Sequence, residues 1–229
     1  MNTRRKQMTI ARGMLISIEG IDGSGKSTLV RHLAKQLQTY DCSVVTTKEP
    51  GGSSLGKLLR EILQHQPVAL MSRAEYLLFA ADRAQHMDEV IKPALKSGAV
   101  VISDRMADSS LAYQGYGRGE DLAMINTINV WAMQEIKPDL TFYLKIEPEE
   151  AIERLKKRTT LTAFEKEQTG FVKRLITGFD EIFRDRDNVI TLDGTLSPEE
   201  IAESATQAVM QWATARELRG KQGEINGGR

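Results

Sequence analysis

The chain has 229 residues, of which 41% are hydrophobic and 27% are charged, so it can bury one sizeable core without a second domain. Lysine plus arginine equals aspartate plus glutamate at 31 each, which excludes the overall positive field that non-specific nucleic-acid binding uses. The single cysteine, Cys42, excludes an intramolecular disulfide and fits a reducing compartment.

Membrane and export signals are missing from the sequence as given. No apolar run approaches the length of a membrane span, and the basic segment 1–13 lacks the apolar centre of a signal peptide. We therefore expect a soluble, cytoplasmic protein with no membrane partner and no nucleic-acid partner.

Short apolar runs alternate with longer periodic segments along the chain. Strands are predicted at 14–19, 43–48, 99–104, 140–146 and 188–193, and helices at 26–39, 72–96, 121–135, 148–158 and 197–217. Most of these strands are apolar on both faces, as is typical of a parallel sheet covered by helices on both sides. The pattern predicts a doubly wound α/β fold with a five-stranded parallel sheet.

The segment IEGIDGSGKST between the first strand and the first helix carries the strongest motif. It satisfies G-x-x-x-x-G-K-[ST] and lies between a strand and a helix, as a P-loop requires. Backbone N–H groups of such a loop surround phosphate oxygens, the lysine reaches the β and γ phosphates, and the hydroxyl takes a Mg²⁺ site. We predict an ATP site formed by Gly20, Ile21, Asp22, Gly23, Ser24, Gly25, Lys26, Ser27 and Thr28. Lys26 is expected to be exposed, and Ser27 is the predicted Mg²⁺ ligand.

The motif leaves two uses open, which are nucleotide hydrolysis by a switch or motor and phosphoryl transfer by a kinase. A GTPase-like switch should carry a guanine-reading N-K-x-D segment, which the sequence lacks. A motor ATPase usually has paired acids after its second apolar strand, whereas the strand AVVISD is followed by Arg105. An arginine at a strand end faces the same crevice as the loop and could hold a second phosphate. The alternative for Asp104 and Arg105 is a surface ion pair.

Four further segments follow the P-loop: EPGGSSLGKLLRE (49–61), LLFAADRAQH (77–86), DRMADSSLAYQGYGRG (104–119) and KPDLTFYL (137–144). In motifs and order the chain resembles the bacterial thymidylate kinases over about residues 14–213. The resemblance implies direct in-line transfer of the γ-phosphoryl group of ATP to dTMP with Mg²⁺, giving dTDP and ADP, in a homodimer. A kinase of another nucleotide or nucleoside, or a non-catalytic P-loop module, remains the alternative.

The resemblance also implies residue roles. Arg60 and Arg105 match the arginines that hold the acceptor phosphate, and Asp22 and Glu49 match the acids near the sugar 3′-OH and the metal. Tyr113 matches the ring that blocks a ribose 2′-OH, and LDGTLS (192–197) matches a loop near adenine.

The base-binding residues follow from the same comparison. Phe79 matches the aromatic ring on which thymine stacks, although helical spacing alone favours a core residue. Arg83 matches the residue that bonds to a thymine carbonyl. The residues that match those contacting the far edge of the base are Ser109, Ser110 and Gln114. No general base is needed, because the dTMP phosphate is already ionised, so His32, His65 and His86 are expected at the surface or behind the contacting residues.

The lid departs from the family pattern. Members with no basic residue inside the P-loop carry a lid arginine, but Ala163 occupies its place in TAFEKE (162–167). Candidate replacements are Arg154, Lys156, Lys157, Arg158 and Lys166, and Arg158 is preferred because a guanidinium spans two phosphate oxygens. The predicted catalytic residues are thus Lys26, Arg105, Arg158 and Asp22. The domain organisation expected is a loose tail at 1–13, one domain at 14–217 with a short mobile lid at about 154–168, and a frayed tail at 218–229.

Overall fold

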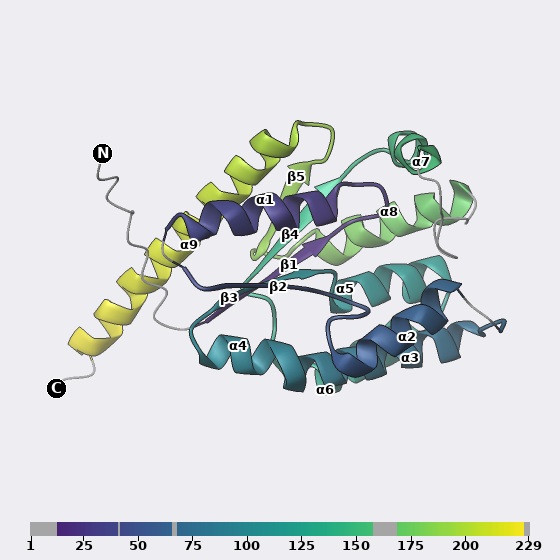
Figure 1. Ribbon diagram of the computed structural model, residues 1–229, viewed down its shortest axis with the longest axis horizontal. Helices are drawn as coiled ribbons and strands as arrows, with labels where there is room; N and C mark the ends of the chain where they lie inside the picture. The colour runs from purple at the N-terminus through teal and green to yellow at the C-terminus, as the bar shows by residue number, and fades with distance from the viewer. Residues whose placement is uncertain (1–12, 41, 66–67, 158–168, 227–229) are drawn as a thin grey trace.

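Five parallel strands form one sheet in the order β2-β3-β1-β4-β5, which confirms the predicted fold class. The computed structural model describes residues 13–40, 42–65, 68–157 and 169–226, with side chains up to residue 216 (Figure 1). The strands are β1 (Met14–Glu19), β2 (Val44–Lys48), β3 (Val100–Asp104), β4 (Leu140–Lys145) and β5 (Val189–Asp193). The strand order reverses beside β1, and ligands of such sheets bind at this switch point, outside the carboxyl ends of the strands.

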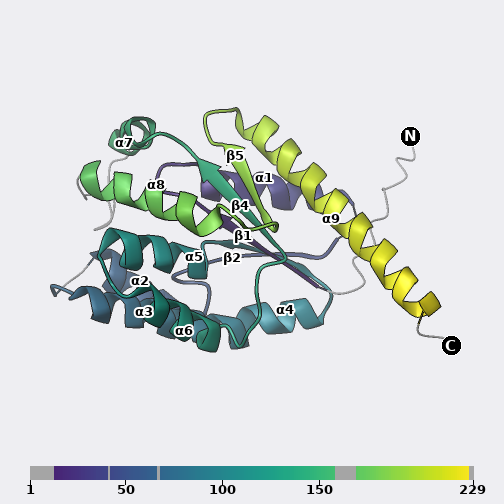
Figure 2. The same ribbon diagram turned by 180° about the vertical axis from the view of Figure 1, so that it is seen from behind.

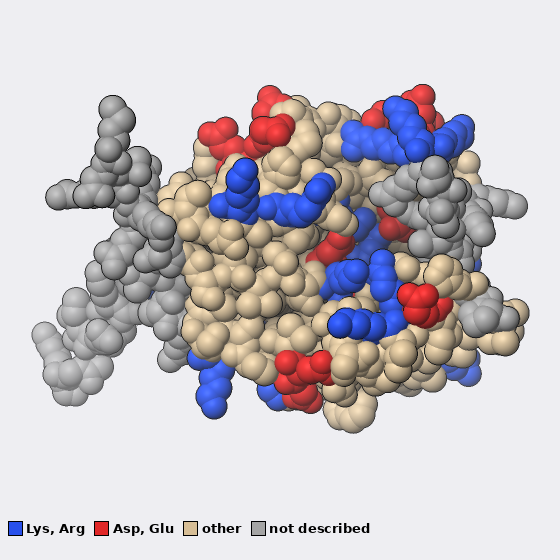
Figure 3. All heavy atoms as spheres, viewed as in Figure 1, with Lys and Arg blue, Asp and Glu red and all other residues tan. Residues whose placement is uncertain are grey.

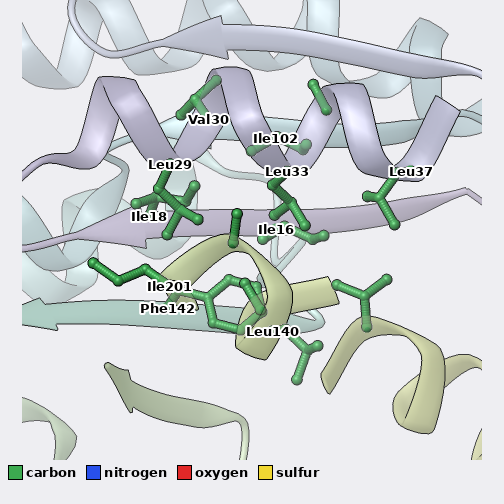
Figure 4. Packing of buried hydrophobic residues seen from close by; sticks show 14 of the residues in the cluster. Ile16, Ile18, Leu29, Val30, Leu33, Leu37, Ile102, Leu140, Phe142 and Ile201 are labelled. Atoms are coloured by element: carbon green, nitrogen blue, oxygen red, sulfur yellow. The ribbon is translucent and has the colours of Figure 1, made fainter. Parts of the chain in front are cut away.

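One face of the sheet is covered by α1 (Lys26–Gln38) and α9 (Pro198–Asn226). Figure 4 shows how Leu29, Leu33 and Leu37 of α1 reach Ile16 and Ile18 of β1. The leucines recur every four residues, so one side of α1 is apolar and is buried against the sheet. This packing fixes the start of α1, and therefore the P-loop, relative to β1.

The opposite face of the sheet is covered by other segments, which lie below the strands in Figure 2, whereas α9 lies above them. The π-helical turn η1 (Met87–Ile91) and the following α4 (Lys92–Lys96) pack against β1 and β3 through Leu15 and Val101. Further along, α8 (Thr169–Phe183) and the π-helical segment η2 (Leu111–Gly117) enclose Tyr143 of β4. The prediction of helices on both faces is confirmed.

Three helices extend the molecule beyond the edge of this layer. They are α2 (Ser54–His65), α3 (Ser72–His86) and α6 (Leu122–Ala132), and α3 contacts both of the others. The short α5 (Ala107–Ser110) leads into η2, and α7 (Pro148–Lys156) follows β4. The sequence reading did not assign α2 or α8 as helices, although Phe171, Leu175, Phe179 and Phe183 show a four-residue apolar period.

Three of the predicted helices differ in detail from those in the structure. The stretch 72–96 is helical throughout, but η1 interrupts its α-helical hydrogen bonding. Helix α6 begins at Leu122 because the Asp121 carboxylate caps it, accepting from the Met124 N–H at 2.7 Å. Helix α9 runs to Asn226, so it continues into 218–226, beyond its predicted end at residue 217. This stretch contains no proline and several good helix formers, which continue the helix without an apolar face.

No helix within the described ranges is long and apolar enough to cross a membrane.

Candidate active site

The glycine loop joins the end of β1 to the start of α1. Gly20, Gly23 and Gly25 have φ values of 141°, 85° and 102°, a region that residues with a Cβ rarely adopt. At Gly23, a Cβ would lie 2.8 Å from the carbonyl oxygen of Ala151, so α7 also packs closely on the loop. The turn therefore has the backbone shape and the strand–helix context of a P-loop.

Lys26 is buried in this loop, so the expectation of an exposed lysine is wrong. Its side chain is 6% exposed, and Nζ donates to the carbonyl oxygen of Ile21 at 2.8 Å. Burial and the nearby charge of Arg105 lower the pKa of Lys26 from 10.5 to about 8. A bound anion near Nζ would favour the charged form.

Ser27 and Asp104 meet beside the loop. The Ser27 hydroxyl donates to Oδ2 of Asp104 at 2.6 Å, and β1 pairs with β3 so that Ile18 is opposite Asp104. Hydroxyl and carboxylate oxygens are the ligand types that Mg²⁺ takes in nucleotide sites. The described residues contain no cluster of three or more His, Cys, Asp or Glu side chains suited to a metal ion. Asp104 was missed as a candidate, and its position at the end of a buried strand was the available signal.

Arg105 adopts a left-handed backbone conformation, with φ of 74°. Its guanidinium donates to the Gly20 carbonyl oxygen at 2.8 Å, to Asp22 at 2.6 Å, to the Ser109 hydroxyl at 3.0 Å and to the Tyr113 hydroxyl at 2.9 Å. These contacts join the P-loop to the segment after β3. Arg105 is therefore paired with Asp22, across the crevice, rather than in the surface ion pair with Asp104.

Asp22 receives two of the hydrogen bonds at this junction. Besides the Arg105 contact, its Oδ2 accepts from the Tyr113 hydroxyl at 2.9 Å. Burial raises the pKa of an acid, but the charges of Arg105 and Lys26 outweigh it here and lower the pKa of Asp22 from 3.8 to about 2. Asp22 is consequently an ionised hydrogen-bond acceptor at neutral pH and not a proton acceptor.

A buried carboxyl group, Glu19, lies beneath this junction and was missed by the sequence reading. Its oxygens accept from the Ser17 hydroxyl at 2.7 Å, the Met106 N–H at 2.7 Å and the Ser109 hydroxyl at 2.5 Å. Burial, with the nearby charge of Asp108, raises the pKa of Glu19 from 4.5 to about 7. Glu19 is the last residue of β1, and its contacts connect the end of this strand to the segment that carries Arg105. An acid at the end of the buried strand MLISIE was the signal for it.

Glu49 and Arg83 form a buried ion pair on the other side of the crevice. Nε of Arg83 donates to Glu49 at 2.8 Å, and both side chains are almost fully buried. His86 lies behind them, with its Nδ1 3.1 Å from the other Glu49 oxygen. Burial opposes ionisation of Glu49, but Arg83 and His86 outweigh it and lower the pKa of Glu49. His86 thus lies behind a predicted contacting residue, as expected.

A cavity of about 400 Å³ lies at the carboxyl ends of β1, β2 and β3. Figure 3 shows basic and acidic side chains together inside the hollow on this face. Its wall includes fifteen residues predicted from the sequence: Asp22, Gly23, Gly25, Lys26, Ser27, Thr28, Glu49, Arg60, Phe79, Arg83, Arg105, Ser109, Ser110, Tyr113 and Gln114. It also includes six that were not predicted: Lys48, Pro50, Leu63, Gln64, Asp104 and Met106.

Other predicted residues lie away from that wall. Gly20, Ile21 and Ser24 belong to the loop but do not line the cavity. In the turn after β5, a Cβ on Gly194 would lie 3.2 Å from the carbonyl oxygen of Ser24, so this turn lies close to the P-loop. Arg154 is paired with Glu150 at 2.8 Å. Arg158, Ala163 and Lys166 lie outside the described residues.

The parallel sheet, the glycine loop between β1 and α1, and the hydroxyl–carboxylate pair beside that loop define a P-loop nucleotide-binding protein. A profile of the family described as thymidylate kinase matches residues 18–205. The chain belongs to the thymidylate kinase family.

Individual relatives agree with this assignment. A protein named thymidylate kinase from Halothermothrix orenii is 44% identical over 193 residues, covering 83% of this chain and 93% of that protein. One of the same name from Carboxydothermus hydrogenoformans is 43% identical over 190 residues, with the same two coverages of 83% and 93%. A third, from Kosmotoga olearia, is 41% identical over 195 residues, covering 85% of this chain and 94% of that protein.

Proposed function

We propose that the protein transfers the γ-phosphoryl group of ATP to dTMP, giving dTDP and ADP. The observation that carries this proposal is a single cavity in which the P-loop residues Lys26 and Ser27 share a wall with Arg60, Arg105 and Phe79. A site that only hydrolyses its nucleotide needs no second phosphate-binding position. Two further cations, Arg60 and Arg105, and the aromatic ring of Phe79 within the same cavity suit the phosphate and base of a second nucleotide.

Positioning and charge neutralisation are the chemical tasks of this site. The attacking oxygen belongs to a phosphate that is already ionised at neutral pH, so no residue has to remove a proton. In our proposal, Arg60 and Arg105 hold the acceptor phosphate in line with the γ-phosphorus, and Lys26 compensates the charge that develops on the transferred group. Asp22 holds the Arg105 guanidinium in place through the 2.6 Å contact.

Mg²⁺ fits the same arrangement as a partner of ATP. The Ser27 hydroxyl and the Asp104 carboxylate are oxygen ligands at one point beside the loop. These two residues would hold the ion, which would supply positive charge to the phosphate oxygens.

The cytoplasmic location of the protein stays a prediction from the sequence.

An assay of ADP release with ATP and a panel of nucleosides and nucleoside monophosphates tests the reaction. We expect release that depends on dTMP and greatly exceeds release with dAMP, dGMP or dCMP. Release that does not depend on dTMP would show a hydrolase, and dependence on another acceptor would show a different kinase.

Phe79 supports the base-binding part of the proposal, because it is only partly buried and lines the cavity. Phe79→Ala should raise KM for dTMP by about 10- to 100-fold with little change in KM for ATP, since base stacking contributes roughly 1 to 3 kcal/mol. Trp212→Ala is the control, an aromatic truncation in the other core layer that should lower the melting temperature without changing either KM. A large loss of melting temperature in Phe79→Ala with unchanged dTMP affinity would mean that Phe79 is a core residue.

We also infer that the protein is a homodimer. Apolar side chains are exposed on two adjacent helices, at Leu77 of α3 (49% exposed) and at Met124 (59%), Val130 (39%) and Trp131 (79%) of α6. Large exposed apolar groups that gather on neighbouring helices are typical of interaction surfaces. A second copy of the chain is the occupant that we propose, through the same two helices.

Trp131→Glu should therefore convert a dimer into a monomer, because it places a charge in the centre of an apolar contact. Light scattering coupled to size-exclusion chromatography measures the mass directly. Leu196→Glu, which changes an exposed leucine in the turn before α9, should leave the dimer intact. A parent protein that is monomeric at tens of micromolar would contradict the inference.

A further inference from the structure

The buried carboxylate of Glu75 holds the side-chain amide of Gln114. Glu75 lies in the first turn of α3, and Gln114 lies in η2, which contacts α3. Nε2 of Gln114 donates to Oε1 of Glu75 at 2.9 Å, and the two residues are 1% and 2% exposed. Gln114 lines the cavity, whereas Glu75 does not. Glu75 therefore acts on the cavity only through Gln114.

The chemistry of this pair determines which end of the amide faces the cavity. An ionised carboxylate only accepts hydrogen bonds, so Gln114 must turn its NH₂ group toward Glu75. A guanidinium nitrogen of Arg118 lies 3.5 Å from the other Glu75 oxygen, so a positive charge faces this acceptor. Within the described part of the chain, the Gln114 side chain makes no other hydrogen bond. Its carbonyl oxygen is thus left to a ligand in the cavity.

Arg83, on the same cavity wall, has a fixed orientation as well. Four of its five N–H groups are taken by Glu49, Asn129, Ser110 and the Met106 carbonyl oxygen, at 2.7 to 3.3 Å. Among the contacts of the described residues, one N–H on Nη1 of Arg83 is left without an acceptor. The wall therefore presents one donor from Arg83 and one acceptor from Gln114, and neither can exchange its role without breaking a buried contact.

We propose that Glu75 is a specificity-determining positioning residue: by locking the Gln114 amide, it makes the site select a pyrimidine with a 4-oxo group and a ring N3–H. Thymine and uracil offer an acceptor and a donor that complement this wall. Cytosine offers the reverse, a 4-amino donor and an N3 acceptor, so both contacts would be mismatched. This inference rests on the proposed function, and it assigns the selection to a residue that does not touch the base.

Glu75→Gln tests the lock, because a neutral amide can accept from Gln114 or donate to it, and both orientations of Gln114 become available. Sites that pair with the polar groups of a substrate reject mismatched analogues by about 10⁴-fold. We expect the ratio of kcat/KM for dTMP to that for dCMP to fall at least about tenfold in Glu75→Gln, chiefly because dCMP becomes a better substrate. KM for ATP and kcat at saturating dTMP should stay within about threefold.

Glu120→Gln is the matched control. Glu120 also bonds to the start of α3, through Ser72, but does not line the cavity. The ratio of kcat/KM for dTMP to that for dCMP should therefore be the same in Glu120→Gln as in the parent. A merely structural role for Glu75 would lower both activities together and leave the ratio at the parent value, which would overturn the proposal. If the parent shows no release of ADP dependent on dTMP, the proposed function fails first. If the parent is an active dTMP kinase and the ratio is unchanged in Glu75→Gln, only the positioning role of Glu75 is refuted.

A measurement on the parent protein covers the case in which Glu75→Gln does not fold. NMR spectra of glutamine labelled with ¹⁵N, with Gln114→Ala to assign the signal, report on the side-chain NH₂ group. We expect these signals to stay nearly unchanged when dTMP binds, because the NH₂ group remains on Glu75. A large shift with loss of the Glu75 contact would show that the NH₂ group faces the base, and the proposal would be wrong.

Discussion

Replacing Lys26 with methionine should lower kcat by about a thousandfold while the melting temperature stays within a few degrees. In the proposed reaction, the ammonium group compensates charge that develops on the transferred phosphoryl group, and one such donor contributes about 10² to 10³ in rate. Methionine is preferred to alanine because Lys26 is buried, so a shorter side chain would leave a cavity. Steady-state turnover with saturating ATP and dTMP is the measurement.

The fold should tolerate this change because the Lys26 charge does not stabilise the ligand-free protein. Its pKa falls from 10.5 to about 8 on folding, so the folded state releases the proton more easily than the unfolded state. Below pH 8 the protonated lysine therefore costs stability, and that cost disappears as the pH rises toward 10.5. Lys35→Met, on the exposed side of α1, is the control and should keep full activity. Turnover of Lys26→Met within tenfold of the parent would contradict the P-loop assignment.

Arg105→Ala should lower kcat about a hundredfold and raise KM for dTMP at least about tenfold, with a smaller change in KM for ATP. In the proposed reaction, the guanidinium holds the acceptor phosphate and orients it for in-line transfer, so binding and rate should both depend on it. Arg105→Lys should recover only part of the loss, because an ammonium group cannot reproduce four contacts in one plane. Initial rates over a matrix of both substrates separate the constants.

Stability offers a second readout for Arg105. The lowered pKa of Asp22 corresponds to about 2 kcal/mol of stability, which is present above pH 3.8 and is lost as the pH falls toward 2. Removing Arg105 removes most of this contribution, so the melting temperature at pH 7 should fall by roughly 4 to 8 °C. Arg184→Ala, which breaks an exposed pair with Glu181 on α8, should change neither the kinetics nor the stability. An unchanged KM for dTMP in Arg105→Ala would place the acceptor phosphate elsewhere.

The regular parts of the fold could be predicted because their signals are local. Apolar runs such as MLISIE form strands that are buried on both faces, and β1 spans the predicted residues 14–19. The P-loop was visible for the same reason, since glycines at fixed spacing between a strand and a helix specify a backbone shape. The helices α2 and α8 were missed although each has one apolar side, which in α8 is the series Phe171, Leu175, Phe179 and Phe183.

The partners of the polar side chains could not be read from the sequence. Ser27 and Asp104 are 77 residues apart, and Glu19 and Ser109 are 90 apart, so only the pairing of β1 with β3 brings them together. Burial decided the rest: Lys26 was expected at the surface but lies in the wall of the cavity. Whether a charged group is exposed or buried depends on what packs over it, and its own neighbours in sequence do not show that.

The sequence by itself therefore determined the sheet, the phosphate loop and the family, because periodicity, glycine spacing and motif order are properties of the chain. The tertiary structure alone decided that Arg105 binds Asp22, that Glu19 lies beneath both, and that Glu75 holds Gln114. These contacts join residues on different elements and act over about 3 Å, so they exist only after the core has placed those elements side by side.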